Sequence, residues 1–120
     1  MFVINNDITR NMVIISDDTQ IELAAHGFAA IGSEARLEVV RTLVRAGRAG
    51  LSVGDIQART GMAASTLAHH LRVLASAGLI VQEKTGRTVV NRADFARLEA
   101  LAGYILQECC ADETPKERRS

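Results

Sequence analysis

Aromatic residues and proline are scarce in this chain of 120 residues: aromatics make up 3% of it, and it contains one proline. The core must therefore be aliphatic, which agrees with an apolar fraction of 48%. A chain rich in Ala and Leu with so little proline is expected to be mainly helical. Its length predicts one domain, and the modest burial possible at this size favours oligomerisation.

Long apolar runs are also lacking, since no stretch approaches the roughly 20 consecutive apolar residues of a membrane span. The opening segment MFVINNDITRNMVIISDD lacks the basic region and cleavage site of a signal peptide. Cysteine is limited to the adjacent pair Cys109 and Cys110, which is not a disulfide framework. We therefore expect a cytoplasmic protein. The formal net charge is zero, so any affinity for nucleic acid must come from the placement of charges.

Hydrophobic periodicity predicts two helices in the first half of the chain. The first runs over about 19–31 with Asp17 or Asp18 as its cap, and the second begins at Ser33 and ends near Gly47. The second helix is expected to turn four apolar residues inward, namely Leu37, Val40, Leu43 and Val44. Four arginines occupy its other face, interpreted as a solvated surface: Arg36, Arg41, Arg45 and Arg48.

A helix-turn-helix is predicted in LSVGDIQARTGMAASTLAHHLRVLASAGLI. Ser52 and Asp55 form a capping box, the short helix stops at Gly61, and a longer helix runs to Gly78. The longer helix has a buried stripe of Leu67, Leu71 and Leu74 and a polar stripe of Ser65, His69, Arg72 and Ser76. A polar outer face of this kind suits the major groove of DNA. His70, beside the leucines, is interpreted as a half-buried packing residue.

The segments LIVQEK and RTVVNR are rich in β-formers, and the TG between them predicts the turn of a hairpin. From residue 55 to 92 there are five basic residues and two acids, a net charge of +3. The basic residues are Arg59, Arg72, Lys84, Arg87 and Arg92. A chain without net charge can therefore carry a basic face.

A closing helix is expected from about Asp94 to Cys110. Its apolar residues Phe95, Leu98, Ala102, Ile105 and Cys109 recur at alternating steps of three and four, the spacing of a helix-pairing seam. The expected organisation is an N-terminal arm (1–17), a winged helix-turn-helix domain for DNA binding and dimerisation (18–111), and a disordered polar tail (112–120).

The chain resembles the ArsR/SmtB family of bacterial repressors in the order of its elements and in three sequence segments, FAAIGSEARLEVVRTL, STLAHHLRVLASAGLI and GRTVVNR. The resemblance covers about residues 19–110. It implies a mainly α fold with a β-hairpin, a homodimer formed by the first and last helices, and promoter binding that ends when a signal binds. The interface expected from it contains Ile21, Phe28, Phe95, Leu98 and Ile105.

The resemblance also implies which residues face double-stranded DNA, on an inverted repeat. In the recognition helix they are Ala64, Ser65, Ala68 and His69, with Arg72 on the same polar stripe. In the wing, Arg87 resembles the basic residue that reaches the minor groove, and Lys84 lies nearby. The chain departs from the family pattern at Ala68, where serine is usual, and in VVNR, where tyrosines are usual.

Two metal sites of the family have no counterpart in this sequence. Where arsenic-binding thiols would precede the recognition helix stand Ser52, Gly54 and Gln57, and the closing helix has no histidine for the zinc-type site. The run YILQECC instead resembles an arsenic-sensing branch with adjacent cysteines at the end of that helix. Its third cysteine is missing here. A metal site of Cys109 and Cys110 fits a trivalent arsenical, either methylarsenite or arsenite completed by another ligand.

Other interpretations of the two thiols stay open. The pair could sense oxidation or persulfide, or Cys109 could be a packing thiol with no sensing role. A thiol oxidoreductase is disfavoured because the chain lacks Cys-x-x-Cys, a βαβ pattern and a Gly-rich cofactor loop. A protein-interaction module that has lost DNA binding is disfavoured by the polar stripe. We therefore expect a regulator that is not an enzyme and requires no cofactor.

Overall fold

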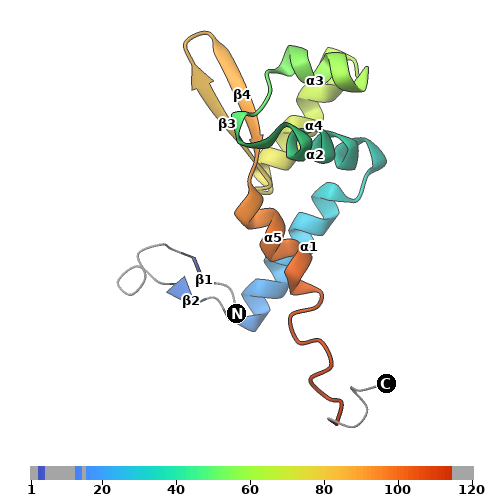
Figure 1. Ribbon diagram of the computed structural model, residues 1–120, viewed down its shortest axis with the longest axis vertical. Coiled ribbons are helices and arrows are strands. Elements are labelled where there is room, and N and C mark those ends of the chain that lie inside the picture. Colours follow the sequence, from blue (N-terminus) through green and yellow to red (C-terminus); the bar gives the residue numbers. More distant parts are fainter. Residues whose placement is uncertain (1–2, 5–12, 15, 115–120) are drawn as a thin grey trace.

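The computed structural model describes residues 3–4, 13–14 and 16–114, and its elements form a winged helix-turn-helix (Figure 1). In chain order the elements are β1 (Val3–Ile4), β2 (Val13–Ile14), α1 (Asp17–Ile31), α2 (Glu34–Ala46), the short 3-10 helix η1 (Gly47–Ala49), α3 (Val53–Thr60), α4 (Ala64–Ser76), β3 (Ile80–Thr85), β4 (Thr88–Ala93) and α5 (Phe95–Tyr104). The expected fold class is confirmed. The short strands β1 and β2 pair antiparallel, with Val3 opposite Ile14.

Helix α1 begins earlier than expected because Ser16 is its N-cap. The Ser16 hydroxyl accepts the backbone N–H of Thr19 at 3.3 Å. The prediction of Asp17 or Asp18 as the cap is therefore wrong. Both aspartates lie in the first helical turn, where a carboxylate interacts favourably with the positive end of the helix dipole.

Helix α2 has the predicted caps but a different buried face. Ser33 caps its start and Gly47 its end. The residues that pack inward are Val39, Val40 and Leu43, whereas Leu37 and Val44 are 45% and 42% exposed. The prediction was wrong for these two because Leu37, Val40 and Val44 also recur at the helical period. The sequence pattern allowed two faces, and the packing against α3, α4 and β4 selects one.

The helix-turn-helix follows the sequence closely. Ser52 caps α3, and Gly61 ends it in the left-handed conformation at φ 76°, which glycine adopts without steric cost. The predicted stripe of α4 is buried, since Leu67 and Leu74 are fully covered and Leu71 is 2% exposed. These leucines join Leu43, Ile56 and Leu79 in one core.

Strands β3 and β4 form the predicted wing in antiparallel register from the Ile80–Ala93 pair to the Thr85–Thr88 pair. The two residues between the strands are Gly86 and Arg87, so the turn lies one residue later than the predicted Thr85–Gly86. Gly86, the first turn residue, has φ 65°, whereas Arg87, the second, is not among the residues with positive φ. This is the pattern of a type II′ hairpin turn.

A fully buried asparagine holds the base of the wing. Asn91 exchanges backbone hydrogen bonds with Leu51 at 2.8 and 2.9 Å, and its side-chain amide donates to the Leu51 carbonyl at 3.2 Å. The side-chain oxygen accepts from Gln82 at 2.8 Å. A Cβ at Gly50 would lie 2.5 Å from the Asn91 carbonyl oxygen, so this close approach requires glycine. In this chain the asparagine ties the wing to the segment before α3.

Helix α5 ends at Tyr104, six residues before the predicted end at Cys110. The chain continues to residue 112 in turns, with three-residue hydrogen bonds such as Cys109 N–H to the Leu106 carbonyl at 2.9 Å. Ile105 and Leu106 are 67% and 66% exposed, so no described part of the chain covers the face that a longer helix would bury. Packing of an apolar face supplies most helix stability, and without it the helix stops. The cysteines therefore follow the closing helix rather than lie in it.

Candidate DNA-binding surface and thiol pair

The outer face of α4 presents the residues predicted to contact DNA. Ser65, His69 and Arg72 are exposed at helical spacing, on the side opposite the three buried leucines. Ala64 and Ala68 are exposed beside them, in the N-terminal half of the helix. The structure thus brings these residues to one surface, with small side chains between groups that can donate or accept hydrogen bonds.

The two adjacent histidines of α4 have different environments. His69 is exposed, whereas His70 is 9% exposed and its Nδ1 has no hydrogen-bond partner within the described part of the chain. Burial lowers the pKa of His70, and the nearby positive charges of Arg36 and His69 lower it further. His70 is therefore a packing residue, neutral at pH 7 and more deeply buried than the half-buried position predicted for it, whereas His69 faces solvent.

The wing contributes two exposed cations, Lys84 on β3 and Arg87 in the turn. Arg92, which the sequence analysis counted with them, is engaged within the protein. It forms an ion pair with Glu83, and its Nε donates to the Arg48 carbonyl at 2.8 Å. Arg92 thus stabilises the wing, whereas Lys84 and Arg87 remain available to a phosphate backbone.

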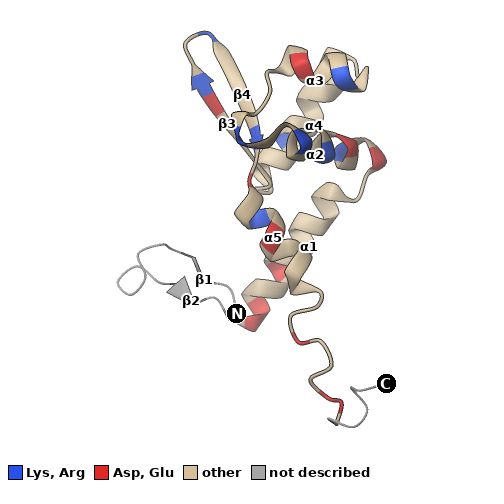
Figure 2. Ribbon diagram, in the orientation of Figure 1, with Lys and Arg blue, Asp and Glu red and all other residues tan. Residues whose placement is uncertain are grey.

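Charge is divided along the molecule (Figure 2). From residue 34 to 97 there are ten Lys and Arg against five Asp and Glu, whereas residues 16–33 have three acids and residues 98–114 have four, with no Lys or Arg in either segment. Basic residues therefore gather over the helix-turn-helix and wing, and acids over α1 and the segment after α5. The zero net charge conceals a basic half suited to a polyanion.

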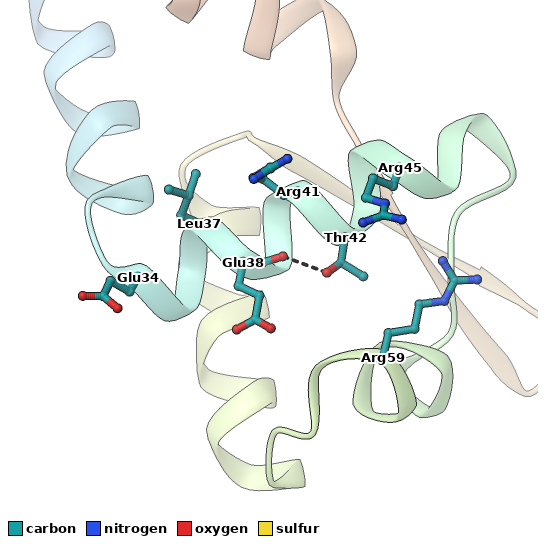
Figure 3. Close-up of a pocket in the computed structure, with 7 residues that line it drawn as sticks. All are labelled: Glu34, Leu37, Glu38, Arg41, Thr42, Arg45 and Arg59. Carbon is teal, nitrogen blue, oxygen red and sulfur yellow. Dashed lines mark hydrogen bonds between the residues drawn. The ribbon is translucent and has the colours of Figure 1, made fainter.

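A groove of about 780 Å³ between α2 and α3 brings arginines of the two helices together (Figure 3). Arg41 and Arg45 come from α2 and Arg59 from α3, and the side chains of Arg45 and Arg59 reach the same part of the groove. Glu38 also lines the groove from α2, one turn before Thr42. The arginine end of the groove can attract an anionic group. Spacing along the chain already places Arg41 and Arg45 on one face of α2, but only the fold brings Arg59 beside them.

The two thiols lie side by side at the surface. The Sγ atoms of Cys109 and Cys110 are 3.0 Å apart, longer than the roughly 2.05 Å of a disulfide. Both residues are exposed, and Cys110 has a left-handed backbone at φ 65°. Hydrogen bonds with Cys109 and then Glu113 raise the pKa of the Cys110 thiol, with a smaller contribution from burial. Within residues 16–114, no three His, Cys, Asp or Glu side chains are grouped to hold a metal ion.

Of the residues predicted for the dimer interface, two lie on α1, two lie at the start of α5, and Ile105 directly follows α5. Ile21, Phe28 and Ile105 are 55%, 38% and 67% exposed, while Phe95 and Leu98 pack partly against the core. Leu106 is an exposed apolar residue of the same region that the sequence analysis missed. The interface stays a prediction. Among the described helices, none is long and apolar enough to cross a membrane.

Comparisons with known proteins agree with this arrangement. A family model described as a helix-turn-helix domain matches residues 31–83. An uncharacterized HTH-type transcriptional regulator of Bacillus subtilis (strain 168), YceK, is 34% identical over 73 residues, which are 61% of this chain and 69% of that protein. The structure of an ArsR-like transcriptional regulator from Rhodococcus sp. RHA1 is 31% identical, covers 84% of this chain and 89% of its own, and has a TM-score of 0.67.

The chain belongs to the ArsR family. It is a transcriptional regulator with a DNA-binding helix-turn-helix, as the sequence indicated. Another similar structure is the homodimeric winged helix-turn-helix domain of Mb0332 from Mycobacterium bovis, a possible ArsR-family regulator. It is 27% identical, with a TM-score of 0.59 over 82% of this chain and 93% of its own.

The lowered pKa of His70 leads to a prediction about how the stability of this ArsR-family protein depends on pH. A base whose pKa is lower in the folded state stabilises the fold above its unfolded pKa, about 6.5, and that stability is lost as the pH falls below it. We expect the free energy of unfolding to fall from pH 7 to pH 5, and His70→Gln to weaken this dependence. Urea unfolding at several pH values measures it. His26→Gln, at an exposed histidine of α1, is the control, and equal slopes for the parent and His70→Gln would contradict the assignment.

Proposed function

We propose that the protein is a homodimeric repressor that binds an inverted-repeat operator through α4 and the wing and is released by a trivalent arsenical bound to Cys109 and Cys110. The observation that carries the DNA-binding part is the exposed polar face of α4 opposite its buried leucines. The basic half of the molecule supports the same role.

On DNA, the N-terminal half of α4 enters the major groove. Ser65 and His69 hydrogen-bond base edges or phosphates there, and Ala64 and Ala68 allow close approach or contact a thymine methyl. Arg72 lies one helical turn further along and contacts the phosphate backbone. Lys84 and Arg87 extend the contact through the wing, with Arg87 at its tip reaching the flanking minor groove.

A homodimer is supported by the apolar residues that α1 and the α5 end expose, Ile21, Phe28, Ile105 and Leu106. Exposed aliphatic and aromatic side chains grouped in one region favour association. The similar Mb0332 domain is described as homodimeric. In the proposed dimer, two α4 helices lie about 34 Å apart, or a multiple of the helical turn, which an inverted repeat matches.

The arsenical is supported by two exposed sulfurs 3.0 Å apart, close enough to bind one soft atom. Methylarsenite, CH₃As(OH)₂, reacts with the two cysteine thiols to give the dithiolate CH₃As(S-Cys)₂ and two waters, so that two As–S bonds replace two As–O bonds without oxidation. Arsenite has no methyl group, so its arsenic needs a third ligand besides the two thiols to complete its three bonds.

Release follows if the ligated turn changes the position of α5. The turn begins directly after Tyr104, and α5 packs on α1 through an Arg97 hydrogen bond to the Leu23 carbonyl at 2.9 Å. A shift of α5 in the proposed interface alters the spacing of the two α4 helices. Coupling of this type typically changes DNA affinity about 5- to 150-fold.

The DNA contacts are tested by fluorescence anisotropy with promoter DNA at several salt concentrations. We expect His69→Ala to weaken binding to the operator by about 1–3 kcal/mol and to relax its sequence preference. Arg87→Gln should weaken binding to all sequences. It should also reduce by about 1 the steepness with which the logarithm of the binding constant falls with the logarithm of the salt concentration. Ser76→Ala, on the same polar stripe near the end of α4, is the control and should change little. Parental behaviour of both test variants would refute the assigned contacts.

The interface is tested with Ile105→Asp. Ile105 is 67% exposed in the single chain, so a carboxylate there costs little unless a partner covers it. We expect sedimentation velocity to show a dimer for the parent at micromolar concentration and a monomer for the variant, with a loss of tight operator binding. Val81→Asp, 46% exposed on the wing, should remain dimeric. A monomeric parent would overturn the proposed dimer.

The thiol site is tested by titrating the protein–operator complex with methylarsenite and with arsenite. We expect both to release DNA from the parent, methylarsenite at least as effectively, because two thiols complete its coordination. Replacing Cys109 or Cys110 by Ser should preserve DNA binding and abolish release, since one thiol cannot chelate. Glu108→Gln, which keeps both thiols, is the control. Equal release from the parent and the double-serine variant would show that the pair is not the sensor.

A further inference from the structure

A second pocket, separate from the thiol pair and from the α4 surface, lies between α1 and α5. Its volume is about 250 Å³. Much of its wall is apolar, with Leu23 and Ala24 contributed by α1 and Ala100 and Leu101 by α5. Ligand pockets are concave and mostly apolar, with a few polar groups that fix the orientation of the ligand.

One of the polar groups of this pocket is a buried amide without a partner. Gln20 lines the pocket and is 5% exposed, and its Nε2 makes no hydrogen bond within the described part of the chain. Leaving a buried donor unpaired destabilises a fold, so such groups are uncommon and call for an explanation. A ligand with an acceptor oxygen would pair this donor.

Besides the polar side chains of Tyr104 and Gln107, the pocket wall includes a cation for which the described residues supply no carboxylate partner. Arg97 lines the pocket from α5 and is half-buried. One of its Nη atoms donates to the Leu23 carbonyl at 2.9 Å, which fixes the guanidinium against α1. Among residues 16–114, no Asp or Glu lies within ion-pair distance of it. The remaining N–H groups of the guanidinium can donate to an anion.

We propose that this pocket binds a small apolar carboxylate as an effector. The carboxylate accepts from Gln20 Nε2 and is balanced by Arg97, while its apolar part packs against Ala24, Ala100 and Leu101. The volume lies just below the roughly 300–1,000 Å³ of pockets for drug-sized ligands, which selects a single ring or a short branched chain. Bound carboxylate adds contacts across the α1–α5 junction and stabilises the packing of the two helices. The binding does not depend on the proposed arsenical site.

The test uses the full-length protein and sodium benzoate as the probe, followed by isothermal titration calorimetry and by amide NMR shifts. We expect saturable binding of one benzoate per chain, with a Kd of about 1 mM or lower, and shifts at residues of α1 and α5. Benzyl alcohol lacks the charge and sodium acetate lacks the ring, so each should bind at least about tenfold more weakly. Absence of saturable benzoate binding, as when a partner chain fills the pocket, would overturn the proposal.

Two variants locate the binding. Gln20→Leu removes the amide donor at similar size, and Ala100→Leu fills the pocket from its other wall, and we expect each to weaken benzoate binding by about tenfold or more. Ala96→Leu, exposed one turn earlier on α5, is the matched control. Circular dichroism establishes folding, and the double-serine variant at Cys109 and Cys110 should bind benzoate normally. Unchanged affinity in both pocket variants would place benzoate elsewhere and refute the assigned site.

Discussion

The burial of three leucines on one face of α4 fixes how the DNA-binding surface is presented. Leu67, Leu71 and Leu74 are almost completely shielded from solvent because they pack into the core, and this packing prevents α4 from rotating about its axis. With that face inward, Ser65 and His69 must point outward, whatever their own interactions. Burying an aliphatic side chain contributes about 1.5–3 kcal/mol, more than exposed polar contacts can offset. The recognition face is therefore a consequence of packing.

The wing depends on a polar interaction instead. Asn91 is fully buried, and its hydrogen bonds to Leu51 and Gln82 give the hairpin a fixed base at the segment before α3. The ion pair of Arg92 with Glu83 lies on the same hairpin. Together these contacts hold the turn residue Arg87 in position relative to α4, although Arg87 itself makes no part of the core.

Sequence reasoning succeeded where local interactions decide the structure and failed where tertiary contacts do. A serine cap and a glycine turn specify the two ends of α3, so Ser52 and Gly61 predicted them correctly. The buried face of α2 and the end of α5 depend on neighbouring elements, and there the predictions for Leu37 and for the helix to Cys110 were wrong. The burial of Asn91 and the pairing of Arg97 with the Leu23 carbonyl join residues 40 and 74 positions apart, which no local pattern reveals.

Helix α5 connects the regions to which we assign regulation. Arg97 and Ala100 line its junction with α1, and the turn that carries Cys109 and Cys110 starts where the helix ends. Because binding free energies are linked, an arsenical that lowers operator affinity by some factor must itself bind the operator complex more weakly by the same factor. A carboxylate that stabilises the α1–α5 packing would act on this same equilibrium. Its sign depends on whether that packing is tighter in the DNA-bound or the released form of the dimer, and the two ligands oppose each other if it is tighter on DNA.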